Sequence, residues 1–195
     1  MTADVHKRIA VAATAIFVLF SLVGNGPSTY RFAVFFLAPL LWGVYLARRA
    51  LCLKASHFAI LGAAFVLHNL GAFGAYRKFY LGLEFDTYVH FFFGFAGGLI
   101  VAQALASLLQ LHGWRLWIGT ALLILGLGAI HELIEYASTL LLGSEKGMLK
   151  TNDPDQFDTQ KDLANNLLGT LLALSIFALA SRKAEETRSP STNRE

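Results

Sequence analysis

The sequence predicts an all-α membrane protein with six transmembrane helices and both termini in the cytoplasm. Three observations lead to this fold class. Of the 195 residues, 55% are hydrophobic and 15% are charged, and the mean hydropathy is +0.53, whereas soluble domains usually carry about 25% charged residues. Apolar stretches of about 20 residues, the length that crosses a bilayer as a helix, recur along the chain. Basic residues are distributed unequally between the segments that join these stretches.

The apolar stretches leave no room for a separate soluble domain. We predict one transmembrane domain over residues 1–181 and a disordered cytoplasmic tail over 182–195, because that tail is polar throughout. The start of the first helix resembles a secretory signal but lacks a good cleavage site, so we expect the helix to be retained. The single cysteine, Cys52, excludes an internal disulfide. The six predicted helices cover residues 9–25, 30–47, 55–76, 87–111, 114–142 and 163–181.

The positive-inside rule orients these helices. With the N-terminus inside, the cytoplasmic segments hold Lys7, Arg8, Arg48, Arg49, Lys54, Arg115, Arg182, Lys183, Arg188 and Arg194. The outer segments hold only Arg31, Arg77, Lys78, Lys146, Lys150 and Lys161. The net charge of +3 therefore reflects membrane topology. It does not indicate a nucleic-acid partner, since no basic stripe with interleaved aromatic residues is present.

The segment HELIEY, residues 131–136, places polar side chains inside the fifth predicted helix. Two carboxylates three residues apart in a bilayer must be paired, protonated or metal-bound, so Glu132 and Glu135 indicate a functional site. At about 100° per residue, Glu135 falls between His131 and Glu132, which gives the helix one polar stripe. HELIE also comes within one residue of the zinc motif H-E-x-x-H, and His131 with Glu135 could hold a metal ion while Glu132 acts as base.

Polar residues of the other helices are predicted to lie in the same outer layer. His68 is about two turns from the outer end of the third helix. Asp86 and His90 are four residues apart, as are Asp162 and Asn166, so each pair projects from one helix face. Ionisable residues in membranes usually face the bundle interior or a wet cavity. This convergence predicts a buried polar pocket that faces outward.

The same residues also have structural interpretations. Asp86 could cap the fourth helix, and Thr159 with Asp162, helped by Asp158, could form a capping box. His68 could be an ordinary interhelical hydrogen-bond partner. Gly94 and Gly98 form a small-x-x-x-small pair, whose expected role is helix packing. The outer loop before Asp158 lacks EF-hand spacing, and we expect it to be a solvated loop that covers the site.

Three motifs resemble those of known bacterial membrane families. DTYVHFFFGF, HELIEY and DTQKDLANNLLG are similar to the uncharacterised inner-membrane family typified by YjdF, over about Asp86 to Gly169. This resemblance implies the six-helix plan and an inner-membrane location, and it implies no assigned activity. The motifs also resemble, more loosely, the VanZ-like proteins associated with low-level teicoplanin resistance. Glu135 stands where VanZ-like chains tend to have Gln. The matching positions are Asp86, His90, Phe91, Glu132, Glu135, Asp158, Asp162, Asn166 and Gly169.

Two classes of function follow. The first is an enzyme that acts on an envelope lipid or a lipid-linked head group, with a divalent metal ion as the cofactor its side chains would suit. The second is a non-enzymatic carrier of cations or protons, or a structural membrane protein. The lipid bilayer is the expected partner in both classes, and the sequence specifies no oligomeric state. For the enzyme we predict catalytic roles for Glu132, Glu135, His90 and Asp162, substrate binding by His68, Asp86, Asp158, Gln160 and Asn166, and metal binding by Glu135, His131 and His90.

Overall fold

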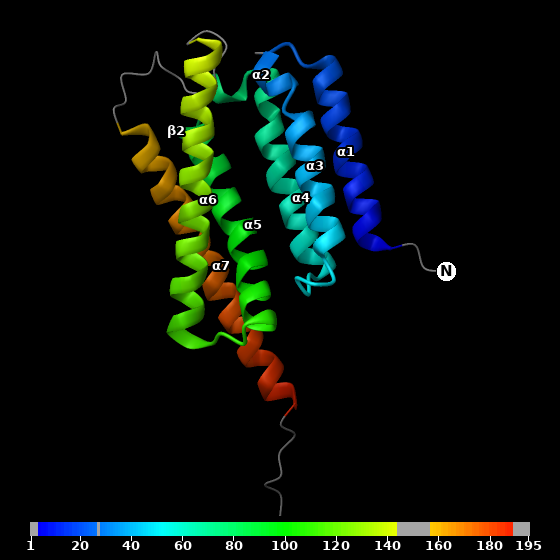
Figure 1. Cartoon of the computed structure of the whole chain (residues 1–195), viewed down its shortest axis with the longest axis vertical. Helices are drawn as coiled ribbons and strands as arrows, with labels where there is room; N and C mark the ends of the chain where they lie inside the picture. Colours follow the sequence, from blue (N-terminus) through cyan, green and yellow to red (C-terminus); the bar gives the residue numbers. More distant parts are fainter. Residues whose placement is uncertain (1–3, 27, 144–156, 189–195) are drawn as a thin grey trace, which may run out of the picture.

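Helices dominate the computed structural model, which describes residues 4–26, 28–143 and 157–188 (Figure 1). Within these ranges, five helical segments are long and apolar enough to cross a membrane, and α3 is a shorter apolar helix. The predicted all-α membrane class is therefore confirmed. The elements are α1 (Val5–Val23), α2 (Ser28–Arg31), α3 (Val34–Ala47), α4 (Ala55–Asn69), the 3-10 helices η1 (Leu70–Phe73) and η2 (Ala75–Arg77), the strands β1 (Phe79–Tyr80) and β2 (Leu83–Glu84), α5 (Phe85–Leu108), α6 (Gly113–Leu142) and α7 (Asp158–Arg188).

The second and third predicted helices are interrupted in the structure. Residues 30–47 form α2 and α3 with a turn between them. Two hydrogen bonds join the residue before the break to α1: the Ser21 hydroxyl donates to the carbonyl of Arg31, and the Arg31 side chain donates to the carbonyl of Ser21. The third predicted helix changes into η1 after Asn69, and Gly74 then separates η1 from η2 with a φ of +74°, a conformation that glycine adopts without strain.

The first and last helices are longer than predicted. α1 begins at Val5 because Asp4 caps it, accepting a hydrogen bond from the His6 amide at 3.0 Å. Asp4 also accepts from Tyr45 and from Arg48, which ties the start of the chain to the end of α3. α7 begins at Asp158 and continues to Arg188, so it includes the first part of the predicted tail, where Ala, Lys and Glu favour helix.

The helices pack as two groups, which we call the N-half (α1 to α4) and the C-half (α5 to α7) (Figure 1). In the N-half, α1 packs against both α3 and α4. In the C-half, α5 and α7 share the most extensive helix contact in the described chain, and α6 packs on both. The halves meet where α4 packs on α5, and Ala96 of α5 joins the core of the N-half. That core contains Ala10, Ala13, Phe17, Ala33, Leu37, Leu41, Phe58, Leu61, Ala64 and Phe65.

Glycine brings the backbones of α5 and α7 together. A Cβ atom on Gly94 would collide with the carbonyl of Asn166, and one on Gly169 would collide with the carbonyl of Phe91. Thr170 stabilises the contact, because its hydroxyl lies 2.7 Å from the Asn166 carbonyl and 3.2 Å from that of Gly94. Gly98 faces α7 in the same contact. The predicted packing role of Gly94 and Gly98 is confirmed, and Gly169 supplies the matching surface on α7.

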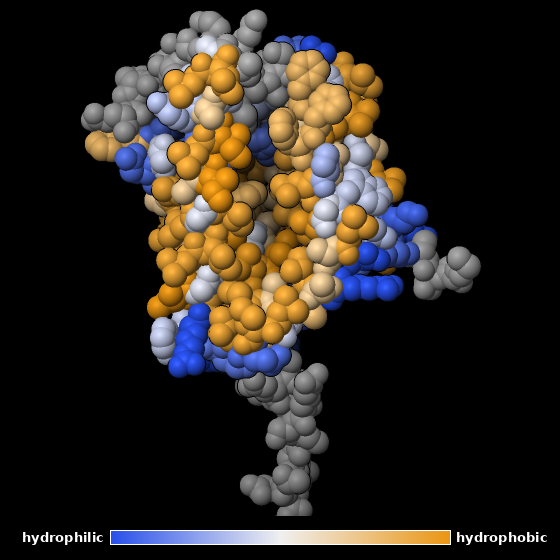
Figure 2. Space-filling view, in the orientation of Figure 1, coloured by the Kyte–Doolittle hydropathy of each residue, from blue (hydrophilic) through white to orange (hydrophobic). Residues whose placement is uncertain are grey.

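The surface of the bundle is apolar over most of its height. Figure 2 shows hydrophobic side chains along the helices and hydrophilic side chains concentrated near the helix ends. Large apolar side chains such as Phe36, Leu46 and Leu141 are more than three-quarters exposed. Soluble monomers rarely expose apolar surface on this scale, so the surface is suited to lipid.

Candidate functional site

The polar residues of the central and last helices meet at one end of the bundle. α4 and α6 run toward this end, whereas α5 and α7 begin there (Figure 1). His68, Asp86, His131 and Asp162, which lie far apart in the sequence, are thereby brought to the same depth. The clustering expected from the sequence is present, and the contacts within it are as follows.

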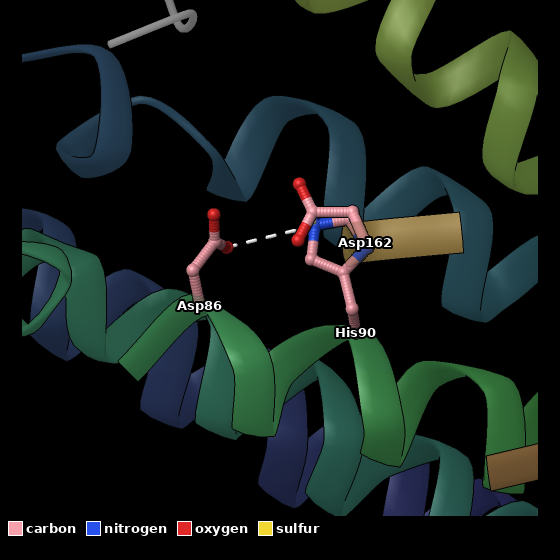
Figure 3. A group of neighbouring side chains, drawn as sticks. All are labelled: Asp86, His90 and Asp162. Atoms are coloured by element: carbon pink, nitrogen blue, oxygen red, sulfur yellow. Dashed lines mark ion pairs between the residues drawn. The ribbon is translucent and has the colours of Figure 1, made fainter. Parts of the chain in front are cut away.

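Asp86, His90 and Asp162 form the tightest group of potential metal ligands in the described chain. Nε2 of His90 lies 3.5 Å from Oδ1 of Asp86 and 3.6 Å from Oδ2 of Asp162. One ligand atom from each residue lies within 4.8 Å of those of the other two. His90 and Asp162 are only 4% and 3% exposed. Figure 3 shows Asp86 and His90 projecting from the same side of α5, with the Asp162 carboxylate against the His90 ring.

Asp86 is not the N-cap residue of its helix. Glu84 occupies that position, and Asp86 lies in the first turn of α5. The spacing of four residues brings its carboxylate over the His90 ring, one turn further along. The capping role that the sequence left open for Asp86 is therefore corrected in favour of a position beside His90.

Asn166 supports the ring of His90 from the other side. Its Nδ2 lies 3.4 Å from Nδ1 of His90, and it is 1% exposed. Its Oδ1 has no hydrogen-bond partner among the described residues. Gly128 of α6 makes room for this amide, because a Cβ at Gly128 would lie 2.7 Å from Nδ2. If the Asn166 amide is turned by 180°, Oδ1 can accept a hydrogen bond from a protonated Nδ1 of His90. Nε2 of His90 then carries no proton and can bind a metal ion.

His131 and Glu135 form a neighbouring pair on α6. Nε2 of His131 lies 3.3 Å from Oε1 of Glu135, and their side chains are 34% and 16% exposed. The His131 ring lies between two other imidazoles, with its centroid 5.8 Å from that of His90 and 6.4 Å from that of His68. In the described chain, His90 thus lies with Asp86 and Asp162, while His131 and Glu135 pair with each other.

Glu132 points away from that pair, toward α7. Its Oε2 accepts a hydrogen bond from the Thr159 hydroxyl at 3.1 Å, and its Oε1 has no hydrogen-bond partner among the described residues. The residue is 6% exposed. Thr159 lies inside the first turn of α7 and donates to Glu132. This contact takes the place of the capping box that was expected between Thr159 and Asp162. The sequence contained a signal for this, since Thr159, Asp162 and Asn166 share one helix face.

Two tyrosines that the sequence analysis did not identify complete the wall of the site. The Tyr76 hydroxyl lies 2.5 Å from Nδ1 of His68. The Tyr30 ring stacks on that of Tyr76, with centroids 4.5 Å apart and an interplanar angle of 9°. Burial, helped by the nearby Asp86 carboxylate, raises the pKa of Tyr76 well above its usual value, so Tyr76 keeps its proton beside His68. A regular helix through residue 76 would place Tyr76 about 12 Å beyond His68 along the axis, and the turns η1 and η2 shorten that path.

The remaining predicted binding residues are more exposed. Asp158 is half-buried at the start of α7, and Gln160 is exposed. The loop expected to cover the site includes residues 144–156, which lie outside the described residues. Figure 2 shows a furrow between the surface of α6 and the N-half, with hydrophilic side chains in its upper part. Part of the polar end of the bundle is therefore visible in the furrow beside α6 (Figure 2).

Comparison with known proteins gives one match. Neither a curated protein nor a solved structure matches the chain. The family model described as "Predicted membrane protein (DUF2238)" matches residues 6–183, a range that includes every residue of the site. The chain therefore belongs to the DUF2238 family of predicted membrane proteins.

Proposed function

We propose that the protein binds a divalent metal ion through Asp86, His90 and Asp162 and uses it in a reaction on the head group of a membrane lipid. One observation carries the proposal: two carboxylates and an imidazole, from two helices, converge with ligand atoms within 4.8 Å at a buried position near one end of the bundle.

The distances within this group suit a shared ion. At 3.5 and 3.6 Å, the contacts are too long for strong hydrogen bonds. Two atoms bound to one tetrahedral zinc ion at about 2.1 Å lie roughly 3.4 Å apart. Buried carboxylates are costly unless they are paired or coordinate a metal ion. Three protein ligands of the nitrogen and oxygen type leave a fourth position for water or substrate, as in catalytic zinc sites.

The surrounding residues have roles that fit this centre. Asn166 would accept the proton on Nδ1 of His90 and so hold Nε2 toward the ion, as outer partners of metal-bound histidines do. Glu132 would accept the proton of an attacking water, which the leaving oxygen of the lipid would then receive. Glu135 with His131, and His68 with Tyr76, would contact the head group. Asp158 and Gln160 would line its approach.

The lipid substrate and the location belong to the same proposal. We expect the site, near the ends of α5 and α7, to lie close to head-group depth, and the furrow beside α6 would give lateral access (Figure 2). By the positive-inside rule, the end of the bundle that carries the site faces outward and both termini are cytoplasmic. The membrane of this proposal is a bacterial inner membrane. The resemblance to YjdF-like proteins, and more loosely to VanZ-like proteins, supports this assignment.

Metal content is the first test. Protein purified in detergent without chelator should contain close to one equivalent of metal by elemental mass spectrometry. Asp86→Asn and Asp162→Asn variants should lose it. Glu135→Gln is the matched control, because it removes a nearby carboxylate outside the ligand group. Metal-free wild-type protein would refute the proposal, and loss of metal in Glu135→Gln alone would move the ligand set to HELIEY.

Activity is tested separately with the metal-loaded protein. Mixed micelles of bacterial envelope lipids should yield a released or transferred head group, detected by mass spectrometry of the lipid and water phases. Glu132→Gln should keep the metal and the fold and lose the product. If Glu132→Gln instead lowers only thermal stability, Glu132 is structural.

A carrier of protons or cations is the second candidate. The successive imidazoles of His68, His131 and His90, with centroids 6.4 and 5.8 Å apart, favour it because histidines can pass protons. Proteoliposomes with an imposed pH gradient distinguish the candidates. Dissipation of the gradient that depends on His131 supports the carrier, and an unchanged gradient excludes it.

A further inference from the structure

The short hairpin between η2 and α5 has a turn that is unusual for its sequence. Phe79 pairs with Glu84, and Tyr80 pairs with Leu83, in an antiparallel ladder. Leu81 and Gly82 form the two-residue connection with φ angles of +53° and +81°. Turns with two positive φ angles favour Asn-Gly or Asp-Gly, because a side chain such as leucine is strained there.

Among the described residues, Leu81 gains almost no packing from the rest of the chain. Leu81 is 99% exposed, and its neighbours Phe79 and Leu83 are 68% and 50% exposed. The tip is therefore strained and apolar at once. Asn or Asp would adopt this turn with less strain and would suit water, so the apolar tip indicates an apolar environment.

The hairpin is also fixed in place beside the membrane-spanning helices. The amide of Phe85 donates to the carbonyl of Lys78 at 3.1 Å, and the Tyr88 hydroxyl donates to the carbonyl of Tyr80 at 2.6 Å. The preceding span ends at Phe73 and the next begins at Phe85. The hairpin is thus held at the surface of the bilayer that these two helices cross.

Exposed positive charge stands directly before the apolar tip. Arg77 and Lys78 are both exposed. Basic residues beside inserted apolar side chains are typical of membrane interfaces, where they contact lipid phosphates.

We propose that residues 79–83 insert into the interfacial layer of the membrane that the chain itself spans, with Arg77 and Lys78 at the phosphates. This contact holds the end of the bundle that carries the polar site at head-group depth. It is independent of the proposed metal and reaction.

Site-directed spin labelling tests the contact on the whole protein. In a Cys52→Ser background, a label at Leu81→Cys or at Phe79→Cys is measured in vesicles of phosphatidylethanolamine and phosphatidylglycerol. Gln110→Cys is the matched control, because Gln110 is exposed and has a φ of +52° in the loop between α5 and α6, at the opposite end of the bundle. The measurement compares how strongly two reagents speed the relaxation of the spin label. One is oxygen, which concentrates in lipid, and the other is a water-soluble nickel chelate.

Insertion predicts that oxygen relaxes the labels at positions 79 and 81 more than nickel does, with the reverse order at position 110. Equal nickel access at positions 81 and 110 would place the hairpin in water and overturn the proposal. Labels at 79 and 81 that neither reagent reaches would show that protein covers the tip, either a second copy or another part of this chain, and would overturn it as well.

Discussion

Oδ2 of Asp162 on α7 lies 3.6 Å from Nε2 of His90 on α5, one helical turn from the place where Gly94 of α5 lets the backbone of α7 touch at Asn166. The position of the carboxylate is thereby set by backbone packing. Packing of α5 on α7 and the geometry of the candidate site are linked, and both can be tested by substitution.

The Gly169→Ala variant should be destabilised. The new Cβ would meet the Phe91 carbonyl, and overpacking of this kind typically costs about 1–3 kcal/mol. Thermal unfolding in detergent measures the effect. Gly126→Ala is the control, because a Cβ at Gly126 meets nothing within 4 Å and alanine favours helix. Equal melting temperatures for Gly169→Ala and wild type would contradict the close contact.

The Asn166 side chain should control metal affinity through His90. Asn166→Asp keeps an oxygen that can accept the proton on Nδ1, so it should retain the metal. Asn166→Leu removes that acceptor and should weaken binding by about 10–100-fold, as loss of outer partners does in known sites. Competition with a chelating dye measures both variants. Wild-type affinity in Asn166→Leu would remove Asn166 from the proposed centre.

Thr159 should stabilise the fold only while Glu132 is present. Thr159→Val leaves Oε2 of Glu132 buried without its donor, and an unsatisfied buried polar group costs about 1–3 kcal/mol. The same change in a Glu132→Leu background should have little effect. Thermal unfolding of the four proteins forms a double-mutant cycle, and additive effects would show that the hydrogen bond contributes nothing to stability.

The native cysteine reports the orientation of the chain. Cys52 is exposed in the turn between α3 and α4, and the positive-inside rule places this turn in the cytoplasm. A membrane-impermeant maleimide should therefore label wild-type protein in intact spheroplasts only after permeabilisation. A Cys52→Ser variant carrying Gln160→Cys should be labelled in intact spheroplasts, because Gln160 is exposed at the start of α7, on the side predicted to face outward. Labelling of Cys52 in intact spheroplasts would reverse the predicted topology.

The sequence predicted the long helices well because hydropathy measures apolar length. It placed α5 and α6 within a few residues of their observed bounds. It missed the break after Arg31 and the tight turns after Asn69, since hydropathy registers neither hydrogen bonds nor the backbone conformation of a glycine such as Gly74. It also began the last helix at residue 163, where the apolar run starts, and left out the polar residues from Asp158 onward. In the structure these residues are helical.

Pairs within one helix were predictable, whereas pairs between helices were not. The spacing of four residues anticipated the contacts of Asp86 with His90 and of His131 with Glu135. The contact of Asp162 with His90 depends on how α7 is rotated against α5, which the sequence does not state. Glu132 and Glu135 were expected on one stripe, yet they face different neighbours, because three residues separate them by about 60° around the helix axis.

The division of the bundle into two halves separates the candidate metal ligands from the residues that form the opposite wall of the site. Asp86, His90 and Asp162 all belong to the C-half, whereas His68, Tyr76 and Tyr30 belong to the segments that precede it. The halves meet chiefly where α4 packs on α5. The three candidate ligands thus keep their mutual distances independently of how the N-half packs on α5.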